Sequence, residues 1–435
     1  MHPYDLKSIS KGFALQILTR KYKGKTMKTG RSYPKFIISA KGTRWTDTGH
    51  PWIYESDVLT EDNSCENGAL VDAVSEGGKY IGTGFLSRNS KIRIRLVSHN
   101  ANDRFDAAFW ERRIRYAWEY RKTVMRDDTS CCRVIFGEAD GFPGLTVDRF
   151  GTILVTQTLS AGMENIKSVV FPLLVKTLRD DGQEICGIYE RNDVAIRTLE
   201  GLEPGKGWFL LSGEEPPESR VTAISENGIT YTVDFENGQK TGFFLDQKYN
   251  RLAVAKLAKD KTVLDCFTHT GSFALNAANG GAKHVTAVDV SSSAIRMAEE
   301  NARQNGLDGI MDFITADVFD FLSELEQKGG HPYDFIILDP PAFTKSRKTA
   351  SNAEKGYREI NTRALRLLPR GGWLATCSCS HFMPSEQFEK MLHAAARDAG
   401  KQLMQIEARQ QAPDHPILWN VPETDYLKFY LFRVI

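Results

Sequence analysis

The chain has 435 residues, more than one ordinary hydrophobic core supports, which predicts two or three domains. A hydrophobic content of 41% and a charged content of 26% are typical of a globular protein, and no apolar run reaches the roughly 20 residues of a membrane helix. The net charge of +1 does not by itself indicate a nucleic-acid partner. Seven thinly spread cysteines and the lack of a secretory segment favour reduced thiols and a cytoplasmic location.

Residues 1–33 form a basic arm. They carry eight lysines and arginines against Asp5 alone, eight minus one, or +7. An arm of this charge is suited to contact with phosphates. A disordered leader from an upstream start codon is the alternative, because "MKTGRSYPKF" would also begin plausibly at Met27. The composition leaves both readings open.

Residues 34–100 have the pattern of a small β domain. The segments "KFIISA", "ALVDAVS", "YIGTGFLS" and "KIRIRLVS" alternate apolar and polar residues, as half-buried strands do. The intervening "EGGK" is typical of a hairpin turn. We therefore expect a β barrel or sandwich.

Residues 101–212 have a mixed α+β pattern. "RFDAAFWERRIRYAWEYRKTVM" and "IKSVVFPLLVKTL" have helical spacing, whereas "LTVDRFGTILVTQTL", "GIYERND" and "VAIRTLEG" predict strands. The acidic, proline-bearing "GEEPPES" at 213–219 predicts a linker to the next domain.

Residues 213–435 repeat a rhythm of strand, loop and helix. The segments "TVLDCF", "HVTAVDVS", "MDFITADV", "YDFIILDPP" and "GGWLATCSC" are each followed by a helical pattern, which predicts a parallel sheet covered on both faces. The last two strands, "LMQIEARQ" and "YLKFYLFRVI", lack a helix between them. That antiparallel finish is unlike a nicotinamide-binding domain.

Acidic residues end three successive strands of this region. Asp265 closes the first strand before a small-residue turn containing Gly271, Asp289 follows 24 residues later, and Asp317 ends the third strand. One glycine in place of G-x-G-x-x-G, beside an acidic residue, suits a pyrophosphate poorly but suits the amino-acid cation of S-adenosylmethionine. Asp289 is placed for ribose hydroxyls and Asp317 for the adenine amino group. Singly each could be a helix N-cap, but together they predict a methyl-donor site.

The fourth strand ends in a rigid acidic turn. Asp339 is followed by Pro340 and Pro341, which force an extended backbone. A carboxylate beside outward-pointing carbonyl groups can grip the edge of a flipped base, with Phe343 as a stacking face and Lys345 reaching phosphates. The alternative is a proline stop after a core strand.

Two cysteines, Cys377 and Cys379, lie at the end of the fifth strand. A thiolate adding to C6 of a cytosine makes C5 nucleophilic, which gives a reason to place Cys379 here, with Asp339 stabilising the adduct. Cys377 is interpreted as a buried packing residue. No second cluster with metal-ligand spacing is evident, so we expect no metal, and C-x-C lacks the usual redox spacing.

The motifs "TGFFLDQKYNR", "DCFTHTGSFALNAANGGA", "DPPAFTKSR" and "CSCSH" resemble the bacterial rRNA large subunit methyltransferase I family, which methylates cytosine C5. "GHPWIY" with "SKIRIRL" resembles its RNA-binding PUA domain, and "DGFPGLTVDRFG" with "YERNDVAIRTLEGL" its β-β-α-β-β middle domain. The resemblance covers residues 34–435. It implies an α/β chain whose last domain is a Rossmann-like class I methyltransferase with a seven-stranded sheet and an antiparallel last strand. It also implies that Gln247, Phe267 and Thr270 lie at the cofactor and that Cys379 is the nucleophile.

The sequence departs from many RNA cytosine-C5 methyltransferases at Ala342, where those enzymes carry a cysteine that helps release product. Two alternatives therefore stay open. One is methylation of a base nitrogen, such as guanine N7 or an exocyclic amine, without a covalent step. The other is a non-catalytic RNA-binding factor of ribosome assembly. We expect large-subunit rRNA as the partner, before or during assembly, and no membrane; a homodimer stays open.

Overall fold

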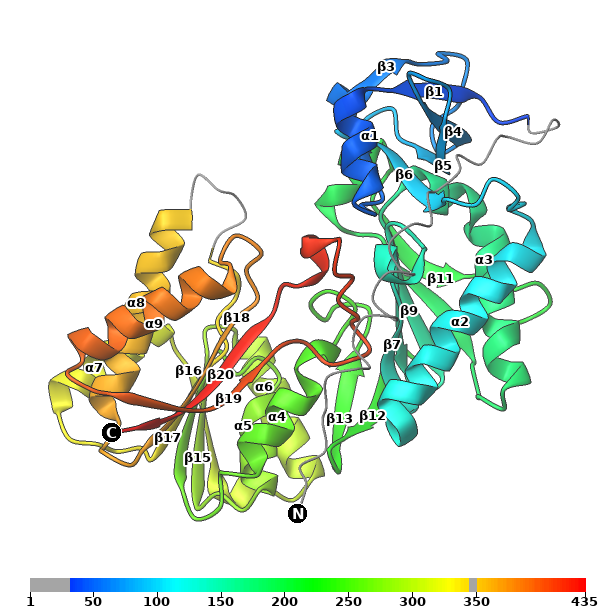
Figure 1. The fold of residues 1–435 in the computed structure, drawn as a ribbon. Coiled ribbons are helices and arrows are strands. Elements are labelled where there is room, and N and C mark those ends of the chain that lie inside the picture. Colours follow the sequence, from blue (N-terminus) through cyan, green and yellow to red (C-terminus); the bar gives the residue numbers. More distant parts are fainter. Residues whose placement is uncertain (1–31, 344–349) are drawn as a thin grey trace, which may run out of the picture. The chain divides into compact units, whose positions relative to one another are not determined.

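The computed structural model describes residues 32–343 and 350–435. The basic arm up to residue 31 and the predicted phosphate contact Lys345 lie outside the described residues. The chain divides into two compact units, Met1–Arg104 and Phe105–Ile435 (Figure 1). Within the described ranges, no helix is both long enough and apolar enough to cross a membrane.

The first unit contains a six-stranded sheet in the order β2-β6-β5-β4-β1-β3. Its strands are β1 (Lys35–Ile38), β2 (Trp52–Tyr54), β3 (Val58–Thr60), β4 (Leu70–Ser75), β5 (Tyr80–Leu86) and β6 (Ile92–Ser98). These strands confirm the β architecture predicted from alternation. Helix α1 (Ala40–Asp47) was not predicted; it begins where the Ser39 side chain accepts a hydrogen bond from the backbone N–H of Gly42.

The second unit begins with a five-stranded sheet in the order β11-β10-β9-β8-β7. Its elements are α2 (Ala107–Met125), β7 (Cys131–Phe136), β8 (Leu145–Phe150), β9 (Ile153–Thr158), α3 (Ala161–Asp180), β10 (Gly187–Arg191) and β11 (Lys206–Phe209). The expected β-β-α-β-β motif is present as β8, β9, α3, β10 and β11. The helix predicted at "RFDAAFWERRIRYAWEYRKTVM" is present as α2, which packs on α3, and the structure adds the edge strand β7.

The strand predicted at "VAIRTLEG" is wrong, because Ala195–Glu200 forms a 3-10 helix. Arg197 is buried there and donates hydrogen bonds to the carbonyl oxygens of Thr158 and Glu203. Gly201 then closes the turn with a φ of +72°. The hydrogen bonds of the buried Arg197 therefore favour a 3-10 helix in a segment whose apolar residues follow a β-like pattern.

The hairpin β12 (Val221–Glu226) and β13 (Ile229–Asp234) follows the predicted linker. One hydrophobic core runs from the five-stranded sheet through this hairpin into the second large sheet, and it includes Phe150, Val155, Tyr231, Val233 and Val263. The two sheets of Phe105–Ile435 are thus joined by continuous packing.

The second large sheet has seven strands in the order β16-β15-β14-β17-β18-β20-β19. The strands are β14 (Thr262–Cys266), β15 (His284–Asp289), β16 (Met311–Thr315), β17 (Phe335–Leu338), β18 (Trp373–Ser378), β19 (Leu403–Arg409) and β20 (Lys428–Val434). The first five are parallel, and β20 runs antiparallel to both of its neighbours. The predicted sheet and its antiparallel finish are confirmed.

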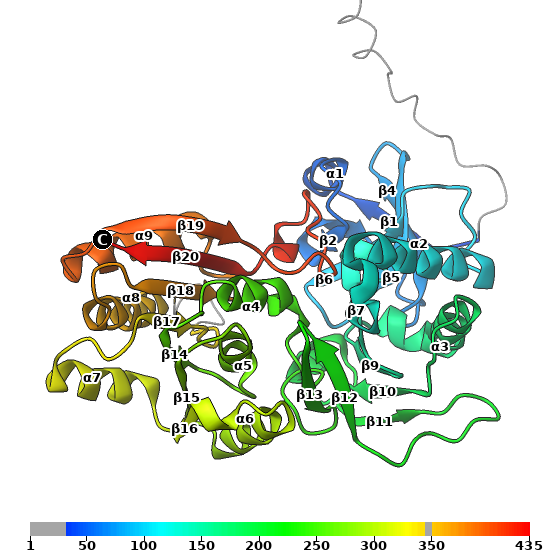
Figure 2. The same cartoon turned by 90° about the horizontal axis from the view of Figure 1, so that it is seen from below.

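Helices cover both faces of this sheet, as Figures 1 and 2 show. One face carries α4 (Lys248–Ala255), α5 (Ser272–Asn279) and α6 (Ser292–Gln304), and the other α7 (Val318–Lys328), α8 (Ala350–Leu367) and α9 (Ser385–Asp398). The strand order reverses between β14 and β17. In such sheets the carboxyl ends of the strands at the reversal form the ligand-binding crevice.

Candidate active site

Asp265 lies fully buried near the end of β14, at the point where the strand order reverses. Its Oδ2 accepts hydrogen bonds from the Thr268 hydroxyl at 2.5 Å and from the backbone N–H of Ala274 at 2.9 Å. Its Oδ1 is buried and has no hydrogen-bond partner among the described residues. Burial raises the pKa of Asp265 to about 7, and the nearby Asp339 carboxylate adds to the rise.

The turn after β14 has an unusual backbone. Phe267 and His269 have φ values of +63° and +52°, which non-glycine residues rarely adopt, and Gly271 has +83°. A Cβ atom on Gly271 would lie 2.7 Å from Leu275 Cδ1 and 2.9 Å from Ala298 Cβ. Such strain concentrates at ligand sites, where the surrounding structure holds it in place.

The carboxylate of Asp289, at the end of β15, fixes this turn. Its Oδ2 accepts a hydrogen bond from the backbone N–H of His269, and its Oδ1 accepts one from Ser291, both at 2.9 Å. Val290 follows with 70% of its surface exposed. An exposed valine beside the predicted ribose contact Asp289 is a feature that sequence reasoning missed, because one valine after a strand is unremarkable.

Asp317 caps helix α7. Its Oδ1 accepts hydrogen bonds from the backbone N–H groups of Phe319 at 2.8 Å and Asp320 at 3.3 Å. The capping alternative weighed for this residue is thus present in the structure. Contact between the second carboxylate oxygen of Asp317 and an adenine amino group stays a prediction.

A methyl donor with two cationic centres fits the β14 edge. The carboxyl groups of Asp265, Asp289 and Asp339 lie close enough to raise the pKa of Asp265 by mutual repulsion, and an ammonium or sulfonium group would relieve that repulsion. The unpartnered Asp265 Oδ1 and the buried, unpartnered hydroxyl of Thr270 offer hydrogen-bond acceptors. The tight turn at Gly271 lets the backbone approach a ligand closely.

Gln247 lies in the 3-10 helix η5 (Leu245–Gln247), directly before α4. Its side-chain amide donates a hydrogen bond to Asp339 Oδ1 at 3.0 Å, and its oxygen accepts one from Asn250 at 2.6 Å. Burial raises the pKa of Asp339 to about 6. The structure therefore places Gln247 against Asp339, the candidate reaction-site carboxylate, with which Cys377 also forms a hydrogen bond.

The turn after β17 meets the end of β18. The Cys379 sulfur lies 4.0 Å from the Pro340 carbonyl oxygen and is partly accessible. Burial and the Asp339 carboxylate raise the pKa of the Cys379 thiol to about 11. Cys377 is fully buried in the core between the sheet and α4–α6. The two cysteines thus differ in their access to solvent, and Cys377 also hydrogen-bonds with Gln247 and Asp339.

Phe343 belongs to an aromatic cluster. Its ring centroid lies 4.7 Å from that of Tyr357, 5.8 Å from Phe319 and 6.3 Å from Phe267. Pro341, by contrast, is exposed. The cluster brings the predicted stacking residue Phe343 next to the predicted cofactor residue Phe267.

Lys428 and Asp246 are site residues that sequence reasoning missed. Lys428 is buried and donates hydrogen bonds to the carbonyl oxygens of Ser380 at 2.7 Å and Tyr426 at 2.8 Å, and burial lowers its pKa to about 8. Burial alone would raise the pKa of Asp246, but Lys240 and other nearby cations hold it at about 2. A lysine in the apolar strand "YLKFYLFRVI" was the available signal for Lys428.

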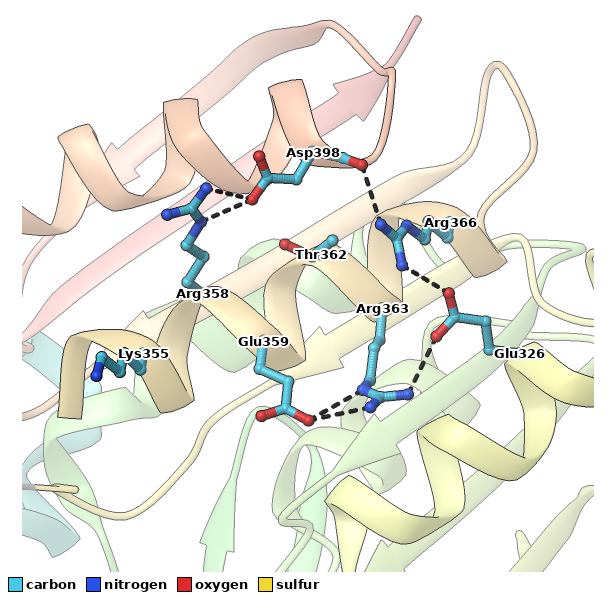
Figure 3. Close-up of a pocket in the computed structure, with 8 residues that line it drawn as sticks. All are labelled: Glu326, Lys355, Arg358, Glu359, Thr362, Arg363, Arg366 and Asp398. Carbon is cyan, nitrogen blue, oxygen red and sulfur yellow. Dashed lines mark hydrogen bonds and ion pairs between the residues drawn. The ribbon is translucent and has the colours of Figure 1, made fainter. Parts of the chain in front are cut away.

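A surface hollow on α7, α8 and α9 is lined by charged side chains that form ion pairs with one another (Figure 3). Arg363 and Arg366 share Glu326, and Arg358 pairs with Asp398. Since these charges compensate one another, the hollow has the character of a surface ion-pair network. Among the described residues, no group of three or more His, Cys, Asp or Glu side chains could hold a metal ion.

Two family models match this chain. The model of S-adenosylmethionine-dependent methyltransferases matches residues 202–433, and that of PUA-like domains matches residues 36–99. A candidate SAM-dependent methyltransferase of Streptococcus mutans has the same fold, with a TM-score of 0.76 at 23% identity over 92% of this chain and 99% of that one. The fold and the β14 edge thus define an S-adenosylmethionine-dependent methyltransferase with a PUA-like domain.

Curated relatives narrow the family. The ribosomal RNA large subunit methyltransferase I of Klebsiella pneumoniae (strain 342) is 38% identical over 94% of this chain and 100% of its own length. That of Aliivibrio fischeri (strain MJ11) is 41% identical over 89% of this chain and 96% of its own length. The chain belongs to the ribosomal RNA large subunit methyltransferase I family.

Proposed function

We propose that this protein methylates C5 of a cytosine in large-subunit rRNA through a covalent bond between Cys379 and C6 of the base. The observation that carries the proposal is the meeting of two strand ends, with the Cys379 sulfur 4.0 Å from the Pro340 carbonyl oxygen and next to Asp339. The names of the relatives support rRNA as the substrate. The PUA-like unit supports RNA binding outside the catalytic site.

The residues of the β14 edge orient the cofactor in this proposal. Asp265 accepts hydrogen bonds from its ammonium group, Asp289 holds the ribose and Gly271 allows close backbone contact. Thr270 and Phe267 line the same turn, and Asp317 reaches the adenine. When bound, S-adenosylmethionine supplies an electrophilic methyl group.

Cys379 and Asp339, which directly follow β18 and β17, act on the base in this proposal. The Cys379 thiolate bonds to C6, and the electrons of the C5–C6 double bond move toward N3, which Asp339 protonates. C5 then becomes an enamine carbon that takes the methyl group. Loss of the C5 proton to water restores the C5–C6 double bond and expels the thiolate. The proton on N3 returns through Asp339 to the Cys379 sulfur, so that one methyl group replaces one proton.

Activation of Cys379 requires a proton acceptor, because a thiol with a pKa of about 11 is protonated at neutral pH. Asp339, whose pKa is about 6, is ionised there and can take the thiol proton before delivering it to N3. Gln247 donates a hydrogen bond to Oδ1 of Asp339, and Cys377 also hydrogen-bonds with this carboxyl group, so that these two side chains orient it for the transfer. Pro340 and Pro341 keep the turn rigid while the base enters.

The test uses large-subunit rRNA transcribed with 5-fluorocytidine, whose fluorine at C5 blocks the final elimination. We expect wild-type protein to form an RNA adduct that survives denaturing electrophoresis. Cys379→Ala should form none and lose methyl transfer by at least about 1000-fold. Cys186→Ala, which removes a partly accessible sulfur outside the candidate site, is the control and should still form the adduct. Normal methylation by Cys379→Ala rules out the covalent mechanism.

The raised pKa of Cys379 favours one second candidate, methylation of a base nitrogen without a covalent step. In that reaction Asp339 binds the edge of the base and Cys379 is a packing residue. Mass spectrometry of nucleosides from the methylated transcript separates the two, since 5-methylcytidine supports the covalent route and 7-methylguanosine or an N-methylated base supports the second candidate.

A further inference from the structure

A cleft of about 550 Å³ opens next to the candidate reaction site. Its lining includes His381, two residues after Cys379, and Lys428, which pairs with Ser378 across β18 and β20. The opposite wall comes from the loop of residues 410–427, which joins β19 to β20. That wall comprises Gln410, Ile417, Leu418, Trp419, Pro422 and Asp425.

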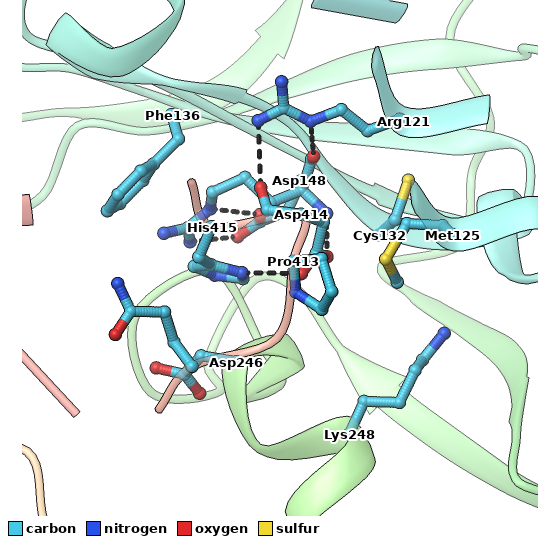
Figure 4. A network of polar contacts seen from close by, with 12 residues as sticks. Arg121, Met125, Cys132, Phe136, Asp148, Asp246, Lys248, Pro413, Asp414 and His415 are labelled. Carbon is cyan, nitrogen blue, oxygen red and sulfur yellow. Dashed lines mark hydrogen bonds and ion pairs between the residues drawn. The ribbon is translucent and has the colours of Figure 1, made fainter. Parts of the chain in front are cut away.

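The first half of this loop is fixed by buried polar contacts (Figure 4). Asp414, fully buried, accepts a hydrogen bond from the backbone N–H of Arg133 at 2.8 Å and contacts His415 Nδ1 at 2.8 Å. The guanidinium of Arg121 donates to the Asp414 carbonyl oxygen at 2.9 Å. These contacts attach the loop to α2 and β7.

The second half of the loop is fixed as well. The Thr424 hydroxyl accepts a hydrogen bond from the Leu418 backbone N–H at 2.8 Å and donates to the Val421 carbonyl oxygen at 2.7 Å. The Tyr426 hydroxyl donates to Asp246 Oδ2 at 2.6 Å. The loop therefore holds its tip in place from both sides, as binding loops on rigid scaffolds do.

The tip of this fixed loop exposes a tryptophan. Trp419 has 97% of its surface exposed, more than any other large hydrophobic residue of the described ranges. Tryptophan is strongly buried on average in folded proteins, so full exposure on an anchored loop beside a reaction site indicates a contact surface. A flat indole ring can stack on any nucleobase.

The cleft also contains an unused acceptor. The Oδ1 atom of Asp425 is buried and has no hydrogen-bond partner among the described residues. A buried carboxylate oxygen without a donor is unfavourable, and an exocyclic amino group of adenine, cytosine or guanine would supply the donor. The exposed His381 and the buried Lys428 also line this cleft.

We propose that this cleft binds a single unpaired nucleobase next to the target cytosine, stacked on Trp419 and held by its amino group at Asp425. The proposal rests on RNA as the substrate and adds a second base-binding subsite to the reaction site. Two lining residues lie close to Cys379, since His381 follows it by two positions and Lys428 is near enough to affect its pKa. The occupant is therefore the neighbouring nucleotide of the same strand.

The first test compares Trp419→Ala, Trp419→Phe and Leu210→Ala, the last a control at a hydrophobic residue 71% exposed and distant in the sequence. Steady-state methylation of a protein-free large-subunit rRNA transcript is measured, together with S-adenosylmethionine binding by calorimetry. We expect Trp419→Ala to raise the KM for RNA about 10-fold with kcat and cofactor affinity unchanged. Trp419→Phe and Leu210→Ala should stay within about twofold of wild type. An unchanged KM in Trp419→Ala overturns the proposal.

The second test concerns the neighbouring base. Once the modified nucleotide is mapped, each nucleotide beside it is changed to uridine, which lacks an amino group. One of the two changes should lower kcat/KM about 10-fold for wild type and leave Asp425→Ala unaffected. Uridine on both sides in the natural transcript, or equal effects in both proteins, overturns the subsite.

Failure of the two proposals can be told apart. If the product is a methylated nitrogen base but Trp419→Ala still raises the KM, the subsite stands and the cytosine-C5 assignment falls. If wild type forms 5-methylcytidine and Trp419→Ala has a normal KM, the subsite alone falls. Wild type that neither binds nor methylates the transcript overturns both.

Discussion

The ammonium group of Lys428 donates a hydrogen bond to the carbonyl oxygen of Ser380 at 2.7 Å, and this contact places a buried cation beside Cys379. The position follows from the sheet, because β20 runs antiparallel to β18 and pairs Lys428 with Ser378. Burial and Asp339 raise the pKa of Cys379, whereas Lys240 and, to a smaller extent, Lys428 lower it. A parallel last strand would put another residue at this position.

Replacing this cation should make Cys379 less reactive. Lys428→Met removes a positive charge near the sulfur, so the pKa of Cys379 rises above about 11 and its alkylation by iodoacetamide slows several-fold at pH 7.5, as checked by mass spectrometry of the modified peptide. Because burial lowers the pKa of Lys428 to about 8, the difference from wild type should shrink above that pH. The control is Lys401→Met, whose ammonium donates to Leu368 elsewhere. Equal alkylation rates in all three proteins contradict the electrostatic role.

Asp265 makes the unliganded protein less stable as the pH rises. Its pKa is about 7 in the native state against a model value of 3.8, so between these values the native state retains a proton that the unfolded state has lost. The free energy of unfolding should fall across that window by on the order of 4 kcal/mol relative to Asp265→Asn, and the two pH profiles should run parallel above about pH 7. Urea unfolding from pH 4.5 to 8 measures this. Parallel curves at every pH mean that Asp265 is ionised throughout.

Gly271→Ala tests the tight turn at the cofactor edge. The new Cβ would lie 2.7 Å from Leu275 Cδ1 in a backbone with φ +83°, so both a clash and backbone strain result. We expect a loss of about 2–4 kcal/mol of unfolding free energy and at least tenfold weaker S-adenosylmethionine binding by calorimetry. Gly306→Ala is the matched control, with φ +66° and no atom within 4 Å of the new Cβ. It should lose about 1–2 kcal/mol and keep cofactor affinity. Equal effects of the two substitutions would show that the clash is without consequence.

Much of the fold could be predicted because its signals are local. Apolar runs such as "FIIL" in β17 and the alternating helices identify a covered parallel sheet without knowledge of distant contacts. The aspartates at the strand ends were found by the same logic, since parallel strands bring their carboxyl ends to one edge. The failure at Ala195–Glu200 has the opposite cause, because contacts of Arg197 with residues far in the sequence decide that segment.

The rest of the candidate site depends on tertiary contacts that no local pattern records. The hydrogen bond from Gln247 to Asp339 joins residues 92 positions apart. The loop with Trp419 is fixed through Asp414 by Arg133, 281 positions away. Lys428 becomes a neighbour of Cys379 through strand pairing alone. Sequence reasoning could name Cys379 and Asp339 but not the groups that tune their pKa values.

The buried ion pair of Glu226 and Arg251 supports the segment that presents Gln247. Arg251 binds both carboxylate oxygens of Glu226, at 2.7 and 2.9 Å, and donates to the Phe244 carbonyl oxygen at 2.7 Å, three residues before Gln247. Both side chains are about 1% exposed, so removing one charge leaves the other buried and unpaired. Glu226→Gln should therefore lose about 3 kcal/mol of unfolding free energy in urea.

The matched control is Glu386→Gln, which breaks an exposed pair with Lys390 of the same 2.7 Å length on α9. It should leave the urea midpoint unchanged, because exposed pairs are screened by water. Glu226→Gln should also lower kcat/KM for methyl transfer at temperatures where it is fully folded, since the Gln247 amide loses its fixed contact with Asp339. Full activity of folded Glu226→Gln would mean that η5 holds Gln247 in position without the buried pair, and equal midpoint shifts in the two variants would mean that burial adds nothing to this ion pair.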